Sequence, residues 1–158
     1  MYSFEYQRAT DPKAAAAAIA ADSDAKFIAG GQSLLPTMRL RLAQPSQLID
    51  VTRIPALKSI TVDAGKVTIG AAVCHADVAD HAELRRVLPA LADLAGHIGD
   101  RQVRALGTIG GSLANNDPAA CYPAARWAWT RPSSPTGDES RRATSSSACM
   151  RPRWRPTS

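Results

Sequence analysis

The amino-acid sequence predicts an α+β fold in which a small β-α-β unit is followed by a second mixed α/β subdomain. An alanine-rich segment at residues 12–21, typical of a helix, lies between two short strand-like segments. A turn sequence at residues 63–66 lies between two further apolar segments and indicates a β-hairpin. The composition changes abruptly near Ala125, so residues 126–158 do not read as part of either subdomain.

The first subdomain is expected at residues 1–55. Asp11 is a suitable N-cap for the alanine-rich helix, and Pro12 suits its first turn. Pro55 marks the boundary with the next part of the chain. Strands are predicted at residues 3–7, 26–29 and 47–51.

The second subdomain is expected at residues 56–125, and it is incomplete. Its hairpin pairs strands at residues 59–62 and 67–72. Apolar residues then follow helical spacing from Leu84 to Ile98. Because Pro89 interrupts this pattern, we expect either a kink or two helices.

Two glycine pairs mark a candidate phosphate site, one within residues 29–34 and one within residues 107–112. Glycine pairs let a phosphate approach backbone N–H groups closely, and any helix that begins just after a loop would add its N-terminus. Ser33, Thr108 and Ser112 add hydroxyl donors. Neither loop contains lysine, and G-x-G-x-x-G is absent, which excludes both common nucleotide motifs. For either pair alone, a simple turn is the stronger interpretation.

The longer motifs around these loops resemble those of a known flavoprotein family. The first reads AGGQSLLP at 29–36 and MRLRL at 38–42. The second reads QVR at 102–104, GTIGGSLANNDPAA at 107–120 and YPAA at 122–125. Residues 1–125 resemble the FAD-binding medium subunit of molybdenum hydroxylases, the carbon monoxide dehydrogenase and xanthine dehydrogenase family.

This resemblance implies a two-part FAD-binding fold with the flavin diphosphate between the two loops. Asp117 matches a position whose carboxylate faces the sugar-like part of the flavin cofactor, although an N-cap or Asx-turn before Pro118 explains it equally well. Ser112 stands where many relatives have Asn. The implied cofactor-binding residues are Ala29, Gly30, Gly31, Gln32, Ser33, Leu34, Thr108, Ile109, Gly110, Gly111, Ser112 and Asp117.

The resemblance also implies an electron-transfer role. A large subunit with a molybdenum cofactor would oxidise the substrate, and an iron–sulfur small subunit would pass electrons to FAD in this chain and onward to an external acceptor. Because the flavin performs the redox chemistry, no catalytic side chain and no metal ligand are expected here. The assembly would be a hetero-oligomer. Its substrate and acceptor cannot be read from this chain.

Other polar residues give weaker signals. His75, His81 and His97 share no ligand spacing, so surface or helix-packing roles are the expected ones. Arg101 and Arg104 flank the second loop and suit either a phosphate contact or a solvated ion pair.

Composition restricts the surroundings of the protein. No apolar run approaches the roughly 20 residues that a membrane span needs. The first residues have neither the basic nor the apolar segment of a secretory leader, which argues against secretion, and the three cysteines, Cys74, Cys121 and Cys149, have no metal-ligand spacing. These features predict free thiols and a cytoplasmic location.

The net charge of +5 belongs entirely to the tail. Residues 1–125 hold 12 basic and 12 acidic side chains, whereas residues 126–158 hold 7 arginines and 2 acids. The tail also lacks Leu, Ile, Val and Phe and is expected to be disordered. Two alternative functions remain: an inactive nucleotide-binding remnant, and a nucleic-acid binder that uses the arginine tail.

We predict that the gene carries a frameshift close to Ala125. Joining the last base of each codon to the first two of the next gives glycine at Trp127–Ala128 and aspartate at Trp129–Thr130, and this frame permits an apolar strand, VGLDATVVT. Sequencing the gene should reveal one inserted or deleted base relative to an intact frame. Early stop codons in the shifted frame would contradict the hypothesis and favour a natural arginine-rich tail.

Overall fold

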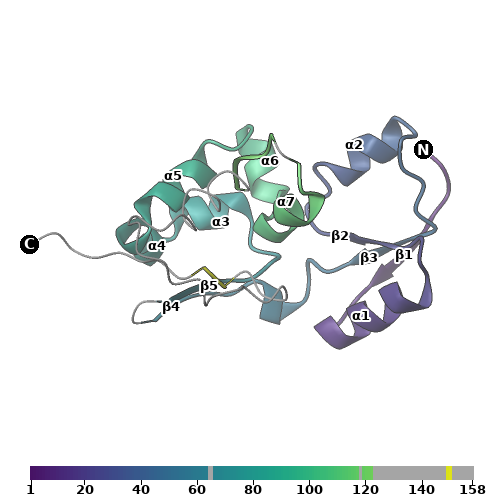
Figure 1. Ribbon diagram of the computed structural model, residues 1–158, viewed down its shortest axis with the longest axis horizontal. Helices are drawn as coiled ribbons and strands as arrows, with labels where there is room; N and C mark the ends of the chain where they lie inside the picture. The colour runs from purple at the N-terminus through teal and green to yellow at the C-terminus, as the bar shows by residue number, and fades with distance from the viewer. Residues whose placement is uncertain (64–65, 118, 123–148, 151–158) are drawn as a thin grey trace, which may run out of the picture.

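The computed structural model describes residues 1–63, 66–117, 119–122 and 149–150. It confirms the α+β class, with a parallel sheet near the N-terminus and an antiparallel hairpin under a group of helices (Figure 1). The boundaries of the two subdomains and the tail remain predictions. The first elements are β1 (Glu5–Arg8), α1 (Pro12–Ala21), β2 (Lys26–Ile28), α2 (Leu34–Arg39) and β3 (Gln47–Asp50).

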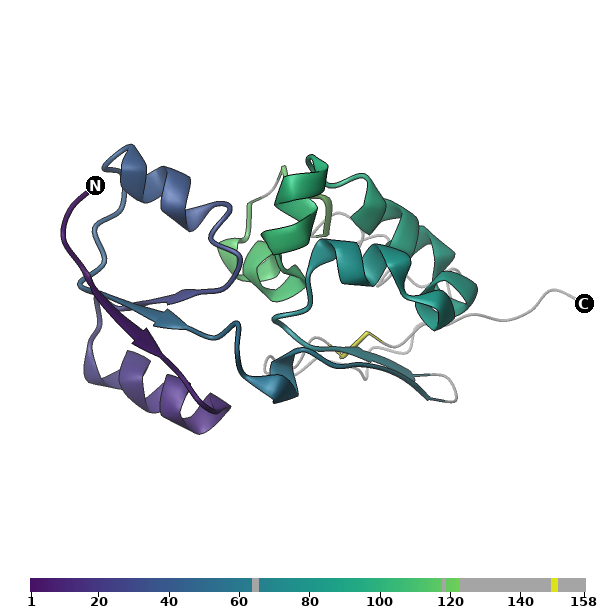
Figure 2. The same ribbon diagram turned by 180° about the vertical axis from the view of Figure 1, so that it is seen from behind.

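The N-terminal sheet has the strand order β1-β3-β2, and both pairings are parallel. Both views place α1 and α2 on opposite sides of this sheet (Figures 1 and 2). Ile49 of the central strand is fully buried in a cluster that includes Ala15 of α1. The first strand begins two residues later than the predicted 3–7, whereas β2 and β3 lie within the predicted segments.

Helix α1 begins as the sequence predicts. One carboxylate oxygen of Asp11 accepts hydrogen bonds from the N–H groups of Lys13 and Ala14, both at 2.9 Å. These bonds satisfy two N–H groups that have no carbonyl partner in the first turn. Pro12, the first helical residue, has no N–H group to satisfy.

The rest of the chain forms a hairpin and a set of short helices. The hairpin is antiparallel, as predicted, and Asp63 pairs with Lys66 beside the turn. The elements are the 3-10 turn η1 (Pro55–Leu57), β4 (Ile60–Asp63), β5 (Lys66–Ile69), α3 (His75–Asp80), α4 (Ala82–Val87), α5 (Pro89–Gly96), α6 (Arg101–Leu106), α7 (Ile109–Asn115) and β6 (Cys149–Met150).

Pro89 divides the predicted helical segment into α4 and α5, which confirms the two-helix alternative. Leu88 between them has φ −134° and ψ 60°, outside the helical region. Proline disfavours a helical residue before it and cannot donate to the preceding turn. Leu88 is nevertheless buried, in the core that joins β5 to helices α3, α4 and α5.

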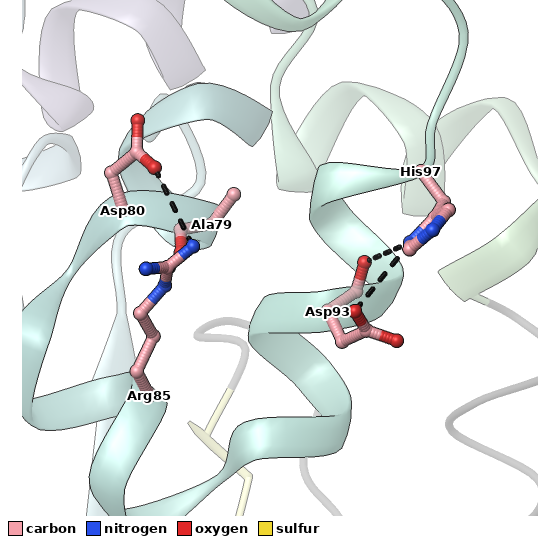
Figure 3. A network of polar contacts seen from close by, with 5 residues as sticks. All are labelled: Ala79, Asp80, Arg85, Asp93 and His97. Atoms are coloured by element: carbon pink, nitrogen blue, oxygen red, sulfur yellow. Dashed lines mark hydrogen bonds and ion pairs between the residues drawn. The ribbon is translucent and has the colours of Figure 1, made fainter.

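A polar contact joins the ends of α3 and α4 at the surface. The Arg85 side chain donates to the carbonyl oxygen of Ala79 at 2.7 Å and lies 3.9 Å from the Asp80 carboxylate (Figure 3). Both charged side chains are largely exposed, so the hydrogen bond, rather than the ion pair, fixes this corner.

Most of the predicted disordered tail lies outside the described residues, as does the strand expected after Ala125. Cys149 and Met150 are described, and here the structure differs from that expectation. They form β6, which pairs antiparallel with Thr68 and Val67 of β5. The second edge of a two-stranded hairpin has unpaired N–H and C=O groups that accept such a strand.

We predict that Gly70→Ala destabilises the fold by about 1–3 kcal/mol. A Cβ on Gly70 would lie 2.2 Å from the Leu57 carbonyl oxygen, so backbone would have to move. Gly96→Ala is the matched control, because its Cβ would have only Ala79 in contact, at 3.8 Å. That variant should be neutral or up to about 1 kcal/mol more stable. Urea unfolding measures both, and equal midpoints would contradict the predicted packing.

Candidate functional site

The second glycine loop is attached by its backbone to the segment that follows β5. The Gly110 N–H donates to the Ala71 carbonyl oxygen at 2.9 Å, and the Ile109 N–H donates to that of Val73 at 3.1 Å. A Cβ on Gly110 would lie 2.5 Å from two atoms of Ala71. Glycine at this position therefore serves the contact between two protein segments.

Thr108 organises the remaining donors of this loop. Its Oγ1 accepts a hydrogen bond from the Gly111 N–H at 3.1 Å, and its carbonyl oxygen accepts one from Ser112 at 3.0 Å. Thr108 is buried and is the N-cap of α7. Consequently, the N–H groups of residues 109–112 all donate to acceptors within the protein.

The first glycine loop differs from the second in the hydrogen bonding of its N–H groups. Within the described part of the chain, the N–H groups of Gly31, Gln32, Ser33 and Leu34 have no acceptor. Gly31 has φ +70°, a conformation that favours glycine, and this turns the backbone after β2. Gln32 and Ser33 are exposed. This loop therefore presents a run of free donors to a ligand.

The two loops contact each other through Gly30. A Cβ at this position would lie 2.1 Å from the Leu106 carbonyl oxygen and 2.7 Å from the Gly107 Cα. The backbone after β2 thus rests directly on the backbone between α6 and α7. These two segments, almost 80 residues apart in the sequence, therefore form one continuous surface.

An open cleft of about 570 Å³ lies along this surface. It is lined by every residue of the first predicted set, Ala29 to Leu34, and by most of the second. Ile109 is the exception: it is fully buried in the core and does not line the cleft. The predicted residues that line it from the second set are Thr108, Gly110, Gly111, Ser112 and Asp117.

Asp117 forms an Asx-turn, one of the roles that its sequence context predicts. Its Oδ1 accepts a hydrogen bond from the Ala119 N–H at 2.8 Å. The residue is exposed and also lines the cleft, and its other oxygen has no hydrogen-bond partner among the described residues. The two roles of this carboxylate are compatible.

The ion-pair interpretation of Arg104 is not borne out, because this residue has no ion-pair partner among the described residues. Its Nη1 donates to the carbonyl oxygens of Gly99 at 2.8 Å and Ile98 at 3.2 Å, which fixes the segment before α6.

The histidines differ from one another. His81 accepts a hydrogen bond from the Leu84 N–H at the start of α4, and His97 is exposed at the C-cap of α5, in agreement with the expected helix-packing and surface roles. His75 is buried and lines the cleft, which sequence reasoning missed. The cleft also includes Lys26 and Phe27 of β2, which belong to no motif that would have selected them.

The comparison with protein families decides the identity of this fold. The family described as the FAD binding domain in molybdopterin dehydrogenase matches residues 2–129. The chain belongs to this family. The family explains why two glycine loops, rather than a single nucleotide motif, line one cleft.

Relatives support this assignment. The carbon monoxide dehydrogenase medium chain of Hydrogenophaga pseudoflava is 45% identical over 125 residues, which cover 77% of this chain and 42% of that protein. The nicotine 6-hydroxylase medium subunit of Paenarthrobacter nicotinovorans is 43% identical over 66% of this chain and 37% of that protein. The chain therefore spans less than half the length of these relatives.

Solved structures show the same fold. The crystal structure of quinoline 2-oxidoreductase from Pseudomonas putida 86 superposes with a TM-score of 0.74 at 36% identity, and covers 75% of this chain and 42% of that one. The Hydrogenophaga pseudoflava carbon monoxide dehydrogenase gives a TM-score of 0.73 at 45% identity and covers 74% of this chain and 41% of that one. In the described residues here, no helix is long and apolar enough to cross a membrane.

We predict that Thr108→Val destabilises the protein by about 1–2 kcal/mol, because it removes the acceptor for the Gly111 N–H while preserving side-chain shape. Hydrogen–deuterium exchange at the Gly111 amide should accelerate at the same time. Thr61→Val makes the same chemical change on an exposed strand residue and should leave both measurements unchanged. Unaltered protection at Gly111 in Thr108→Val would contradict the capping role.

Proposed function

We propose that this chain is the FAD-binding part of an electron-transfer subunit in a molybdenum hydroxylase. The observation that carries the proposal is the arrangement of both predicted glycine loops along one cleft. Family membership supports FAD as the ligand of that cleft. Electrons would reach the flavin from an iron–sulfur subunit and leave to an external acceptor.

The chemistry of the cleft fits an anionic diphosphate. The free N–H groups of residues 31–34 can donate to phosphate oxygens, and the hydroxyl groups of Ser33 and Ser112 add donors from either side. Helices α2 and α7 have only six and seven residues. We therefore assign the diphosphate contacts to the amides of the first loop and to side-chain hydroxyls.

The residues of this chain bind and orient the cofactor. When bound, FAD supplies the ability to accept and release electrons. The first loop would donate hydrogen bonds to it, and the second would hold the opposite wall in place through the contacts of Gly110 and Thr108. No side chain of the chain needs to exchange electrons or protons with a substrate.

The names of the relatives support a set of partner subunits for this chain. Several of them are named medium chains or medium subunits of dehydrogenases and hydroxylases. We extend this to a hetero-oligomer with a molybdenum-cofactor large subunit and an iron–sulfur small subunit. The free thiols of Cys74 and Cys121 support a reducing, cytoplasmic location.

The family match also supports the proposed frameshift. It ends at residue 129, close to Ala125, after which arginine, serine and proline dominate the sequence. The coincidence of these two positions is what a change of reading frame near Ala125 would produce.

Ser112→Trp provides a test of the cleft. The indole would fill space beside the first loop, and we expect FAD affinity to fall at least tenfold, measured by flavin absorbance after equilibrium dialysis. Bulky substitutions at Gly31 or Gly110 are less suitable, because their Cβ atoms would strike Leu35 and Ala71 within the protein.

Ser23→Trp is the control, since Ser23 is exposed and does not line the cleft. It should retain the affinity of the parent chain. Equal affinity in Ser112→Trp would show that FAD binds elsewhere. A folded parent chain that binds no FAD would instead support the inactive remnant, and salt-dependent DNA binding lost on removing residues 126–158 would support the nucleic-acid alternative.

A further inference from the structure

The imidazole of His75 lies at the wall of the cleft, beneath the second glycine loop. Its Nδ1 is 3.1 Å from the Tyr122 hydroxyl oxygen, and its ring packs against that of Tyr122 at a centroid distance of 5.3 Å. Its other edge faces Gly107: a Cβ there would lie 2.9 Å from both Cδ2 and Nε2. Glycine at position 107 therefore leaves room for this edge of the ring beside the backbone.

The edge of the imidazole that carries Nε2 lies toward the cleft. His75 and Gly107 both line the cleft, and Nε2 is on the edge of the ring that faces Gly107. Among the described residues, Nε2 has no hydrogen-bond partner. The rest of His75 is buried, with 4% of its surface exposed.

The environment of Tyr122 determines where the imidazole proton lies. Tyr122 is fully buried, and His75 Nδ1 is the only hydrogen-bond partner of its hydroxyl group among the described residues. A buried O–H donor without an acceptor is costly. Tyr122 therefore donates to Nδ1, which places the imidazole proton on Nε2.

Both groups stay neutral at physiological pH. Burial lowers the pKa of His75 below its ordinary value of 6.5 and raises the pKa of Tyr122 above its ordinary value of 10. Within the described residues, the pair also lacks an ion-pair partner. The phenol consequently remains a donor, and the imidazole keeps a single proton.

We propose that His75 is a cofactor-positioning residue whose Nε2–H donates a hydrogen bond to an oxygen atom of bound FAD, in its diphosphate or its ribityl chain. This inference rests on the proposed FAD function of the cleft. Gly107 leaves room for the imidazole at the wall of the cleft, and Tyr122 fixes the imidazole proton on Nε2. The Tyr122–His75 pair thus extends the donor set of the first loop to the opposite wall.

The first test does not need FAD. Long-range ¹H–¹⁵N spectra of the 158-residue chain at pH 7.5 report which ring nitrogen carries the proton, with His75 assigned by comparison with His75→Gln. We expect the Nε2–H form. In Tyr122→Phe, where the phenol donor is lost, we expect a mixture of both forms. A protonated Nδ1 in the parent chain would overturn the proposal.

The second test measures FAD affinity. His75→Leu should weaken binding roughly 10- to 100-fold, as expected for a lost hydrogen bond to a charged or strongly polar acceptor. His75→Gln keeps an N–H donor and should recover much of the loss. His97→Gln changes an exposed histidine whose ring has Asp93 as its polar partner among the described residues, and it should bind FAD as the parent chain does (Figure 3).

ADP serves as a second probe that carries the diphosphate without the ribityl chain. A loss with both FAD and ADP would place the contact on the diphosphate, and a loss with FAD alone would place it on the ribityl chain; either supports the proposal. Unchanged FAD affinity in His75→Leu would overturn it. Failure of the parent chain itself to bind FAD would refute the proposed function, and the tautomer spectra would still decide whether His75 presents a donor to the cleft.

Discussion

The close approach of Gly30 to the backbone of Leu106 and Gly107 is the constraint on which the site depends. It leaves no room for a side chain, since a Cβ on Gly30 would lie 2.1 Å from a carbonyl oxygen. Without this approach, the loop after β2 would belong to the parallel sheet alone, and the loop before α7 to the helical part. With it, donors supplied by one part lie opposite a wall supplied by the other.

Two similar glycine motifs have different physical roles here. The amides of the second loop donate to Ala71, Val73 and Thr108 and hold that loop in place. The amides of the first loop have no acceptors among the described residues. A glycine pair in a sequence indicates close backbone approach, but the partner can be either a ligand or another segment of protein. Only the hydrogen-bond partners distinguish the two cases.

Features fixed by local chemistry could be predicted from the sequence. The Asp11 cap, the break at Pro89 and the hairpin all depend on interactions between near neighbours. Helices α2, α3, α6 and α7 were not placed, because six or seven residues contain too little periodicity to reveal them. The cleft-lining role of His75 depends on Tyr122, 47 residues away, so no spacing rule could have shown it. The family motifs identified both loops, but they also included Ile109, whose side chain is buried in the hydrophobic core.

The burial of Ile109 explains how the core positions the site. Ile109 belongs to the same buried cluster as Val73 and Tyr122, and its amide is bonded to the Val73 carbonyl oxygen. The wall of the cleft is therefore an extension of the hydrophobic core, fixed before any ligand arrives. The first loop is more exposed, and its donors are hydrated in the absence of a ligand. A ligand with oxygen acceptors replaces that water against a wall that does not have to rearrange, which reduces the ordering cost of binding.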